Sequence, residues 1–364
     1  MLDMNLLADV YGIAFTVYGL MVASALLALL LYKPRRTGVK AKNVVFVIPT
    51  VARPSVMPSL REVLGNLNAR FPWAPIYVVV DEPADEAVVS EIERHAEVVK
   101  VPKDFPGRPC KGRAVEYFRQ MHARPDMWYV ILDDDSYPLD DRFLEELPPF
   151  DSRYAAANGI LVPRPGRSKL AYILDHVRLW DDLTFFRLST GLLGRPIFGM
   201  HGELFIIRGD VFAEVPFPAD SLVEDFVYAQ LLYKRGYKVW QVSTKVSIKS
   251  PNSIRDFLKQ RARWAKGIWM ELHRAHPATV AAVAARKVFG LMVSMLLAPV
   301  WALLHTFNVF GLIGGMYYMS AYIRGVFSSK AWWAVPLIPI LGIFEPLHIA
   351  FLHKIKTFVV IDKT

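Results

Sequence analysis

The chain has 364 residues, which is enough for one large domain or two small ones. Apolar residues make up 53% of it and the mean hydropathy is +0.26, values that are high for a soluble protein and typical of one with membrane-spanning segments. The net charge is +9, but no basic run with interleaved aromatic residues or known nucleic-acid motif is present, so we expect no nucleic-acid partner. The single cysteine, Cys110, excludes an internal disulfide and a cysteine-rich zinc site.

The first expected element is a transmembrane helix. Residues 10–32 carry no charge and form a run long enough to cross a bilayer core. Lys33, Arg35 and Arg36 follow directly, which favours the cytoplasmic side for this end. The run is too long for a secretory signal peptide, and it lacks a basic start and a clean cleavage site. We therefore assign residues 1–39 to an N-terminal transmembrane helix and a basic linker.

Residues 40–250 have the pattern of an α/β domain. Short β-branched runs alternate with helix-like segments, an order that predicts a mostly parallel sheet with helices on its faces. The expected strands are 43–49, 76–80, 97–101 and 127–132, and the expected helices are 55–70, 85–95 and 113–123. Ligands of such sheets bind beyond the carboxyl ends of the strands, where Thr50, Asp81 and Asp133 to Asp135 stand. Three strand ends are therefore expected to converge on one site.

Asp133, Asp134 and Asp135 stand in a row after the fourth expected strand. Carboxylates so close raise one another's pKa and cost free energy unless a cation or several hydrogen-bond donors neutralise them. Asp133 and Asp135 have a spacing that can hold Mg²⁺ or Mn²⁺, which take carboxylate, water and phosphate oxygens as ligands. The alternative is a solvated turn or an acidic helix start, but the position after a buried strand favours the divalent cation.

Residues 251–299 are expected to form amphipathic helices at the membrane surface. Within them, the segment 253–273 alternates aromatic residues such as Trp264 and Trp269 with basic ones. Such a helix lies on a bilayer with its aromatic side chains in lipid and its basic side chains at the headgroups.

Two further spans are expected in residues 300–364. No formal charge occurs between residues 288 and 323, and Pro299 interrupts that run. This pattern predicts an interfacial segment up to about residue 299 and a span over 300–323, because proline breaks helices. A third span is predicted over 331–353.

The basic residues that flank the spans favour an N-terminus outside and a C-terminus inside. Arg286 and Lys287 precede the second span, and Lys354 and Lys356 follow the third. We therefore expect an integral, multi-pass protein of the plasma membrane whose α/β domain, residues 40–250, is cytoplasmic.

Several motifs occur in the order found in a known enzyme family. They are Asp81, Lys111-Gly112-Arg113, the aspartate cluster, Phe198 to Glu203, Glu224-Asp225 and Gln260-Arg261-Ala262-Arg263-Trp264. As a set they resemble the inverting family-2 glycosyltransferases of GT-A fold. The sequence QRARW is similar to the QxxRW signature of membrane-embedded cellulose, chitin and hyaluronan synthases and of egghead-type mannosyltransferases. The resemblance implies a Rossmann-like, mostly parallel GT-A sheet with transmembrane helices, a minimal cellulose-synthase-like architecture.

The resemblance also implies a role for each matching residue. Donor binding would involve Asp81 at the nucleoside, Lys111, Asp133, Asp134, Asp135, Gln260, Arg261 and Arg263, with a divalent metal, Mn²⁺ or Mg²⁺, held by Asp133 and Asp135. Acceptor binding would involve Trp264, His201 and Glu224, and Asp225 would be the general base.

General physical chemistry supports these roles. Inversion by single displacement needs a carboxylate such as Asp225 to take a proton from the attacking hydroxyl while the diphosphate leaves with metal assistance. An aspartate of ordinary pKa suffices, because the hydroxyl loses its proton only as the bond forms. Arg261 and Arg263 can clamp diphosphate oxygens with their planar donor groups, and Trp264 offers a flat face to an acceptor sugar.

Three structural alternatives stay open. Glu224 and Asp225 can form the acidic first turn of a helix that runs to residue 234. His201 can be a purely structural histidine. The QRARW helix can serve only as a membrane-surface helix.

Three spans from one chain can hardly line a channel for a growing polymer. We therefore expect one or a few sugars to be added to a lipid-linked glycan or a glycolipid. The egghead-type resemblance favours GDP-mannose over a UDP-sugar as the donor. The alternatives are a polyprenyl-phosphate sugar synthase, a UDP-sugar-dependent polysaccharide synthase and a catalytically dead membrane scaffold.

Overall fold

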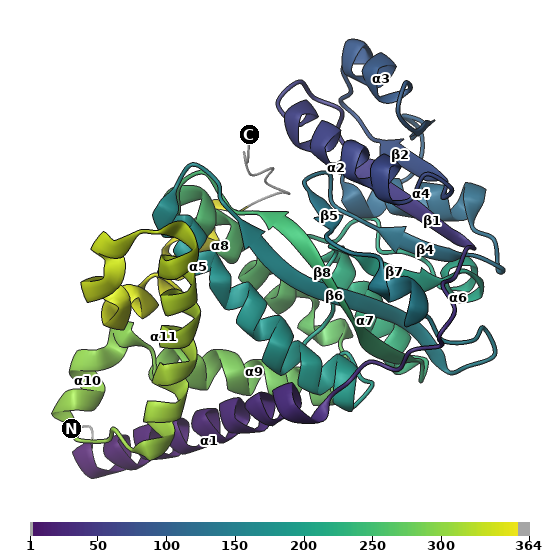
Figure 1. The fold of residues 1–364 in the computed structure, drawn as a ribbon. Coiled ribbons are helices and arrows are strands. Elements are labelled where there is room, and N and C mark those ends of the chain that lie inside the picture. Colours follow the sequence, from purple (N-terminus) through teal and green to yellow (C-terminus); the bar gives the residue numbers. More distant parts are fainter. Residues whose placement is uncertain (1–2, 356–364) are drawn as a thin grey trace.

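The computed structural model describes residues 3–355. Lys356 and the end of the predicted C-terminal segment 300–364 lie outside the described residues. The chain folds into an α/β domain and a group of helices that packs against one side of it (Figure 1).

An eight-stranded sheet forms the centre of the α/β domain. The strands are β1 Val44–Thr50, β2 Ile76–Val80, β3 Glu97–Lys100, β4 Trp128–Ile131, β5 Ser136–Pro138, β6 Tyr154–Arg164, β7 Phe205–Arg208 and β8 Lys238–Lys249, in the spatial order β3-β2-β1-β4-β7-β6-β8-β5. Strands β1 to β4 pair in parallel, and β8 runs parallel to β6. Strand β7 is antiparallel to β4 and β6, and β5 is antiparallel to β8. The predicted mostly parallel sheet is confirmed.

Helices cover both faces of the sheet (Figure 1). They are α2 Met57–Arg70, α3 Glu86–Ile92, α4 Lys111–His122, α5 Lys169–Asp181, α6 Gly209–Glu214, α7 Glu224–Lys234 and α8 Ile254–Glu271, with a π-helix, η2 Asp182–Leu192, continuing α5, and 3-10 helices at Arg142–Glu145 and Leu272–Arg274. Alternate residues of β1 point to opposite faces. Phe46 belongs to the hydrophobic cluster that includes Leu60 of α2, whereas Val47 belongs to the one that includes Phe118 of α4.

The remaining elements are called here the membrane-side helices. They are α1 Met4–Leu31, α9 Pro277–Met292, η4 Met295–Leu297, α10 Ala298–Leu303, α11 Val309–Ser329, and the 3-10 helices η5 Trp332–Ile343 and η6 Pro346–Lys354. Among residues 3–355, two helical stretches are long and apolar enough to cross a membrane, Met4–Leu31 and Pro277–Leu303. A third exists if η5 and η6, which meet at 61°, count as one broken span.

The structure corrects the boundaries predicted for the second span. The expected span over 300–323 is not one helix, because α10 ends at Leu303, α11 begins at Val309, and His305 between them has φ +50°. The apolar helical stretch that is long enough to cross is Pro277–Leu303, most of which was expected to lie at the interface. The Asn308 side chain accepts hydrogen bonds from the first amides of α11 and so fixes its start.

The predicted third span, 331–353, also differs from a regular helix. It consists of η5 and η6, and Pro336 and Pro339 lie inside η5. Proline lacks the amide donor that the interior of an α-helix needs, which explains the irregular geometry.

Helix α11 joins the membrane-side helices to the α/β domain. A Cβ built on Gly325 would lie 2.7 Å from backbone atoms of Ile173 in α5, so glycine permits this close approach. Tyr322 of α11 belongs to the same hydrophobic cluster as Ile173 and Phe257 of α8. Helix α5 therefore lies between β6 and the membrane-side helices, and α8 packs in the same hydrophobic cluster.

Candidate active site

One cavity of about 1630 Å³ extends from the carboxyl ends of β1, β2 and β4 to the membrane-side helices. Every site residue expected from the sequence lines it: Asp81, Lys111, Asp133, Asp134, Asp135, His201, Glu224, Asp225, Gln260, Arg261, Arg263 and Trp264. The membrane-side wall includes Tyr18 of α1, Lys287 of α9 and Glu345. A single space therefore connects the strand ends with the helices expected at the membrane.

Asp81 follows β2 and is only 2% exposed. It forms an ion pair with Arg113 of α4, and its Oδ2 accepts a hydrogen bond of 3.1 Å from the Cys110 amide. The guanidinium of Arg113 also donates to the carbonyl oxygens of Pro102 and Phe105. Asp81 thus anchors the loop that leads into α4 at the edge of the cavity.

The aspartate cluster is partly neutralised by the chain itself. Asp133 forms an ion pair with Lys111, and Asp134 Oδ2 accepts a hydrogen bond of 2.8 Å from Thr50 Oγ1 at the end of β1. Asp135 is 6% exposed. An ammonium and a hydroxyl from two other elements therefore offset part of the repulsion among the three carboxylates.

The cluster fits a metal that is shared with a phosphate ligand. Within residues 3–355, no group of three or more His, Cys, Asp or Glu side chains could hold a metal ion. Mg²⁺ and similar ions that bind nucleotides need only one or two carboxylates, because water and phosphate oxygens complete the shell. Asp133, whose side chain is 29% exposed, and Asp135 both line the cavity and can supply that pair.

Lys111 connects the aspartate cluster with α7. Besides its ion pair with Asp133, its Nζ lies 3.7 Å from Glu224 Oε1 and donates a hydrogen bond of 3.4 Å to the Gly202 carbonyl. Burial opposes the charge, but Asp133 and Glu224 together raise the pKa of Lys111 above its ordinary value. Lys111 is therefore a permanent cation at the centre of the site.

Asp225 is the second residue of α7, so the acidic first turn expected as an alternative is present. Its Oδ1 accepts a hydrogen bond of 2.8 Å from the Phe226 amide. Burial and then the neighbouring Glu224 raise the pKa of Asp225 to about 7, although Lys111 acts in the opposite direction. The ordinary aspartate expected from the sequence is thus a stronger base in the folded chain, and one suited to neutral pH.

The QRARW residues lie on α8, whose first turn is capped by Ser253. Arg261 Nη2 lies 3.2 Å from Asp175 Oδ1 of α5, and its Nε lies 3.9 Å from Glu345 Oε2. Arg263 Nη1 donates a hydrogen bond of 2.9 Å to the Leu222 carbonyl. Both guanidiniums line the cavity, but each is also engaged by the chain, so they fix α8 against its neighbours.

Trp264 also lines the cavity, beside two cations. The guanidinium carbon of Arg178 lies 4.9 Å from the centre of a Trp264 ring, and that of Arg261 lies 4.8 Å from it. Guanidinium groups bind well over indole rings. The ring expected to face an acceptor sugar therefore also supports two arginines.

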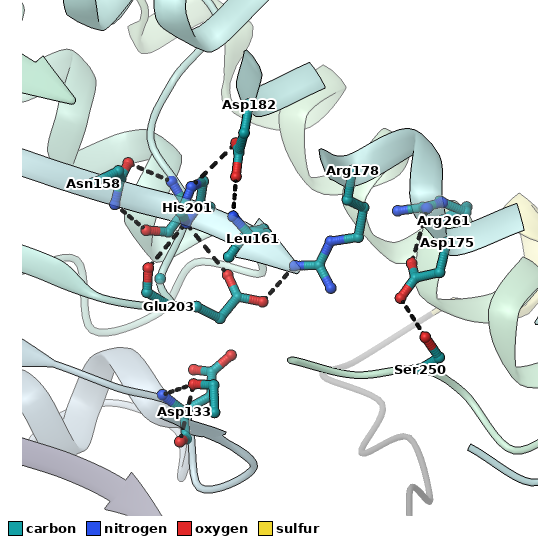
Figure 2. A network of polar contacts seen from close by, with 12 residues as sticks. Asp133, Asn158, Leu161, Asp175, Arg178, Asp182, His201, Glu203, Ser250 and Arg261 are labelled. Carbon is teal, nitrogen blue, oxygen red and sulfur yellow. Dashed lines mark hydrogen bonds and ion pairs between the residues drawn. The ribbon is translucent and has the colours of Figure 1, made fainter. Parts of the chain in front are cut away.

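His201 lies in a buried polar network (Figure 2). Its Nδ1 is 3.0 Å from the Glu203 carbonyl, its Nε2 is 3.3 Å from Asp182 Oδ1, and its backbone exchanges hydrogen bonds with the Asn158 amide group. Burial disfavours the charged ring, but Asp182 outweighs it and raises the pKa of His201. These contacts give His201 a clear structural task in addition to its place on the cavity wall.

The cavity wall also holds an ion pair that was not expected from the sequence. Arg178 of α5 and Glu203, in the loop before β7, form a buried ion pair. Glu203 stands in the quoted Phe198 to Glu203 motif, but no pattern in the sequence links it to Arg178.

The fold resembles that of a solved glycosyltransferase. A mannosyltransferase from Pyrobaculum calidifontis, solved in complex with GDP-Man and Mn²⁺, superposes with a TM-score of 0.60 over 96% of this chain and 99% of that chain, at 15% identity. The expected GT-A fold is confirmed by this likeness.

Two curated relatives share sequence with the chain. The β-1,4-mannosyltransferase bre-3 of Caenorhabditis elegans is 26% identical over 219 residues, which is 56% of this chain and 47% of bre-3. The β-1,4-mannosyltransferase egh of Drosophila melanogaster is 25% identical over 224 residues, 58% of this chain and 49% of egh. The chain therefore spans about half the length of these relatives.

The model of glycosyl transferase family group 2 matches residues 128–345. This range runs from β4 through the aspartate cluster, Asp225 and the QRARW helix to η5. It covers more than half of the chain, and its limits include most of the cavity wall. The chain belongs to glycosyl transferase family group 2.

Proposed function

We propose that the chain is a membrane glycosyltransferase that transfers a sugar, with inversion, from a nucleotide sugar to a lipid-linked glycan or a glycolipid. GDP-mannose is the favoured donor, since the relatives bre-3 and egh are named mannosyltransferases and the structural neighbour was solved with GDP-Man. The observation that carries the proposal is the continuous cavity, which has aspartates at strand ends on one side and membrane-side helices on the other.

The donor would bind at the strand ends. Asp81 would contact the nucleoside, and Asp133 and Asp135 would hold Mn²⁺ or Mg²⁺ together with the diphosphate. When bound, the cation supplies positive charge to the leaving diphosphate. Lys111, whose positive charge is secured by Asp133 and Glu224, adds a second positive group from the chain itself.

The transfer would be a single displacement. Asp225 takes the proton of an acceptor hydroxyl as its oxygen forms a bond to the anomeric carbon. The bond from that carbon to the diphosphate breaks, the electron pair leaves with the diphosphate, and the anomeric configuration inverts. The proton ends on Asp225, whose raised pKa suits it to hold a proton near neutral pH.

The acceptor would come from the membrane. The two apolar helical stretches Met4–Leu31 and Pro277–Leu303 support membrane association. We infer a multi-pass arrangement in the plasma membrane, with residues 40–250 as a cytoplasmic catalytic domain. Residues 251–299 would form the interface, and the region from residue 300 would complete the membrane part.

The proposal is tested first at the donor. Detergent-purified protein is titrated calorimetrically with GDP-mannose, UDP-glucose and UDP-N-acetylglucosamine in the presence of Mn²⁺, Mg²⁺ or chelator. We expect metal-dependent binding of GDP-mannose and transfer of mannose to a glycolipid acceptor, with an inverted anomeric configuration by NMR. Asp135→Asn should reduce the effect of the metal on nucleotide-sugar binding. Asp141→Asn is the control and should leave that effect unchanged, because Asp141 forms an exposed ion pair with Lys40 outside the cavity. If no nucleotide sugar binds under any of these conditions, the proposal is wrong.

A further inference from the structure

Arg178 and Glu203 form an ion pair in the wall of the cavity. Each side chain is 8% exposed. Arg178 Nη1 is buried and has no hydrogen-bond partner among the residues that the structure describes. A buried guanidinium nitrogen without a partner costs free energy, so its retention beside an open cavity indicates a ligand that completes it.

The pair lies between the predicted base and the QRARW helix. A Cβ built on Gly202, which directly precedes Glu203, would lie 3.4 Å from Asp225 Oδ2. On the other side, the Arg178 guanidinium lies over a Trp264 ring. Figure 2 shows Arg178 extending from α5 toward Glu203, apart from the Arg261 and Asp175 pair. A group bound by Arg178 therefore lies within reach of both the base and the indole.

The chemistry of this place favours an uncharged ligand. Glu203 balances the charge of Arg178, and Lys111 is matched by Asp133 and Glu224. Arg261, the other cation at the Trp264 ring, is paired with Asp175. Asp225 adds a further carboxyl group nearby, so an anion would meet more negative than positive charge. The free Nη1 donates and the Glu203 carboxylate accepts, side by side, which matches hydroxyl groups that can both accept and donate.

We propose that Arg178 and Glu203 form a hydroxyl clamp, a subsite that binds two neighbouring hydroxyls of a neutral acceptor sugar and presents a third to Asp225. The inference rests on the proposed glycosyltransferase function and adds the residues that select the acceptor. It also excludes a bare lipid phosphate as the preferred acceptor, because that anion would be placed against Glu203.

The first test separates acceptor binding from donor binding. Arg178→Lys keeps the charge opposite Glu203 but loses the planar pair of donors. We expect the KM for a neutral glycolipid acceptor to rise about tenfold to a hundredfold, with the Kd of the nucleotide sugar unchanged within twofold. Arg187→Lys is the matched control, because Arg187 lies on η2, outside the cavity, and binds Gln241 Oε1 at 3.0 Å.

A second variant distinguishes loss of acceptor binding from loss of folding. Arg178→Gln alone would leave Glu203 buried without its partner, whereas the double change Arg178→Gln with Glu203→Gln leaves a neutral amide pair. The double variant should fold, bind the donor as the parent does, and show the same rise in the KM for the acceptor.

The third test is a competition between two acceptors. The parent chain is offered a neutral glycolipid and a polyprenyl phosphate in the same vesicles, and we expect sugar on the glycolipid. An unchanged acceptor KM in Arg178→Lys overturns the clamp and leaves the transferase proposal standing. Preference for the polyprenyl phosphate overturns the clamp and the acceptor named in the proposed function, but leaves transfer from a nucleotide sugar standing. Absence of donor binding by the parent overturns both.

Discussion

The fold raises the pKa of Asp225, although nothing in the sequence around it distinguishes it from an ordinary aspartate. Replacing it with asparagine keeps the shape and removes the proposed base, so Asp225→Asn should bind donor normally and lose transfer by about 10²- to 10⁴-fold. Calorimetry and a radiolabelled transfer assay measure the two effects. Asp210→Asn, a change in an ion pair with Arg208 outside the cavity, is the control. Transfer at the parent rate by Asp225→Asn would show that another group is the base.

The raised pKa of Asp225 predicts the pH dependence of the reaction. To act as the proposed base, Asp225 must be deprotonated, so kcat/KM should fall as the pH drops through about 7. Burial and then Glu224 raise this pKa, while Lys111 lowers it and Glu203 raises it further. Glu224→Gln should therefore shift the acid limb of the profile to lower pH. A limb that stays in place or moves to higher pH contradicts the assignment.

The lack of a side chain at Gly202 leaves room for the Lys111 ammonium group. A Cβ there would lie 2.2 Å from Lys111 Nζ, so Gly202→Ala must displace the lysine from between Asp133 and Glu224. We expect weaker donor binding with little change in unfolding temperature, since the end of a lysine side chain can move. Gly65→Ala on α2, where a Cβ meets nothing within 4 Å, should leave activity unchanged. Equal donor affinity in both variants would show that the position of Lys111 is unimportant.

The positions of single residues in the fold were partly predictable. Asp81 and the aspartate cluster follow strands that local sequence identifies, so their common location follows from the topology of a parallel sheet. The pairing of Arg178 with Glu203 could not be predicted, because the two stand on elements whose contact depends on the whole fold. The engagement of Arg261 by Asp175 was missed for the same reason.

At the scale of elements, the contact between α11 and α5 is expected to be sensitive. Gly325→Ala would place a Cβ 2.7 Å from the backbone of Ile173, which cannot rotate away. We expect a loss of about 1–3 kcal/mol in the free energy of unfolding. Gly315→Ala on the same helix, where a Cβ meets nothing within 4 Å, is the matched control. Thermal unfolding in detergent measures both, and equal stability of the two variants would show that the helices can separate without cost.

The first four strands were predicted correctly, because each is a short apolar run and helical segments separate β1 from β2, β2 from β3 and β3 from β4. Strands β5 to β8 were not predicted, since their pairing is set by distant partners such as β6 with β8. The boundary predicted for the second span was wrong, because Pro299 was taken to end the interfacial segment, whereas it lies at the start of α10 inside the apolar stretch Pro277–Leu303. Residues 288–323 carry no charge to mark the break near His305.

At the scale of the whole molecule, the sheet and the membrane-side helices contribute to one cavity. The GT-A fold and the place of the site were predictable, since the motifs carry that information. The sequence did not predict that one cavity connects the site with the membrane-side helices, because this depends on how α5 and α8 pack against α11.

The continuity of this cavity has a consequence for enzyme kinetics. One substrate would arrive by diffusion in three dimensions and the other by diffusion in two. The rate should then depend on the mole fraction of acceptor in the bilayer and hardly on its bulk concentration. Diluting a fixed amount of acceptor with inert lipid should slow transfer. Adding more vesicles of the same composition should leave the rate of transfer almost unchanged.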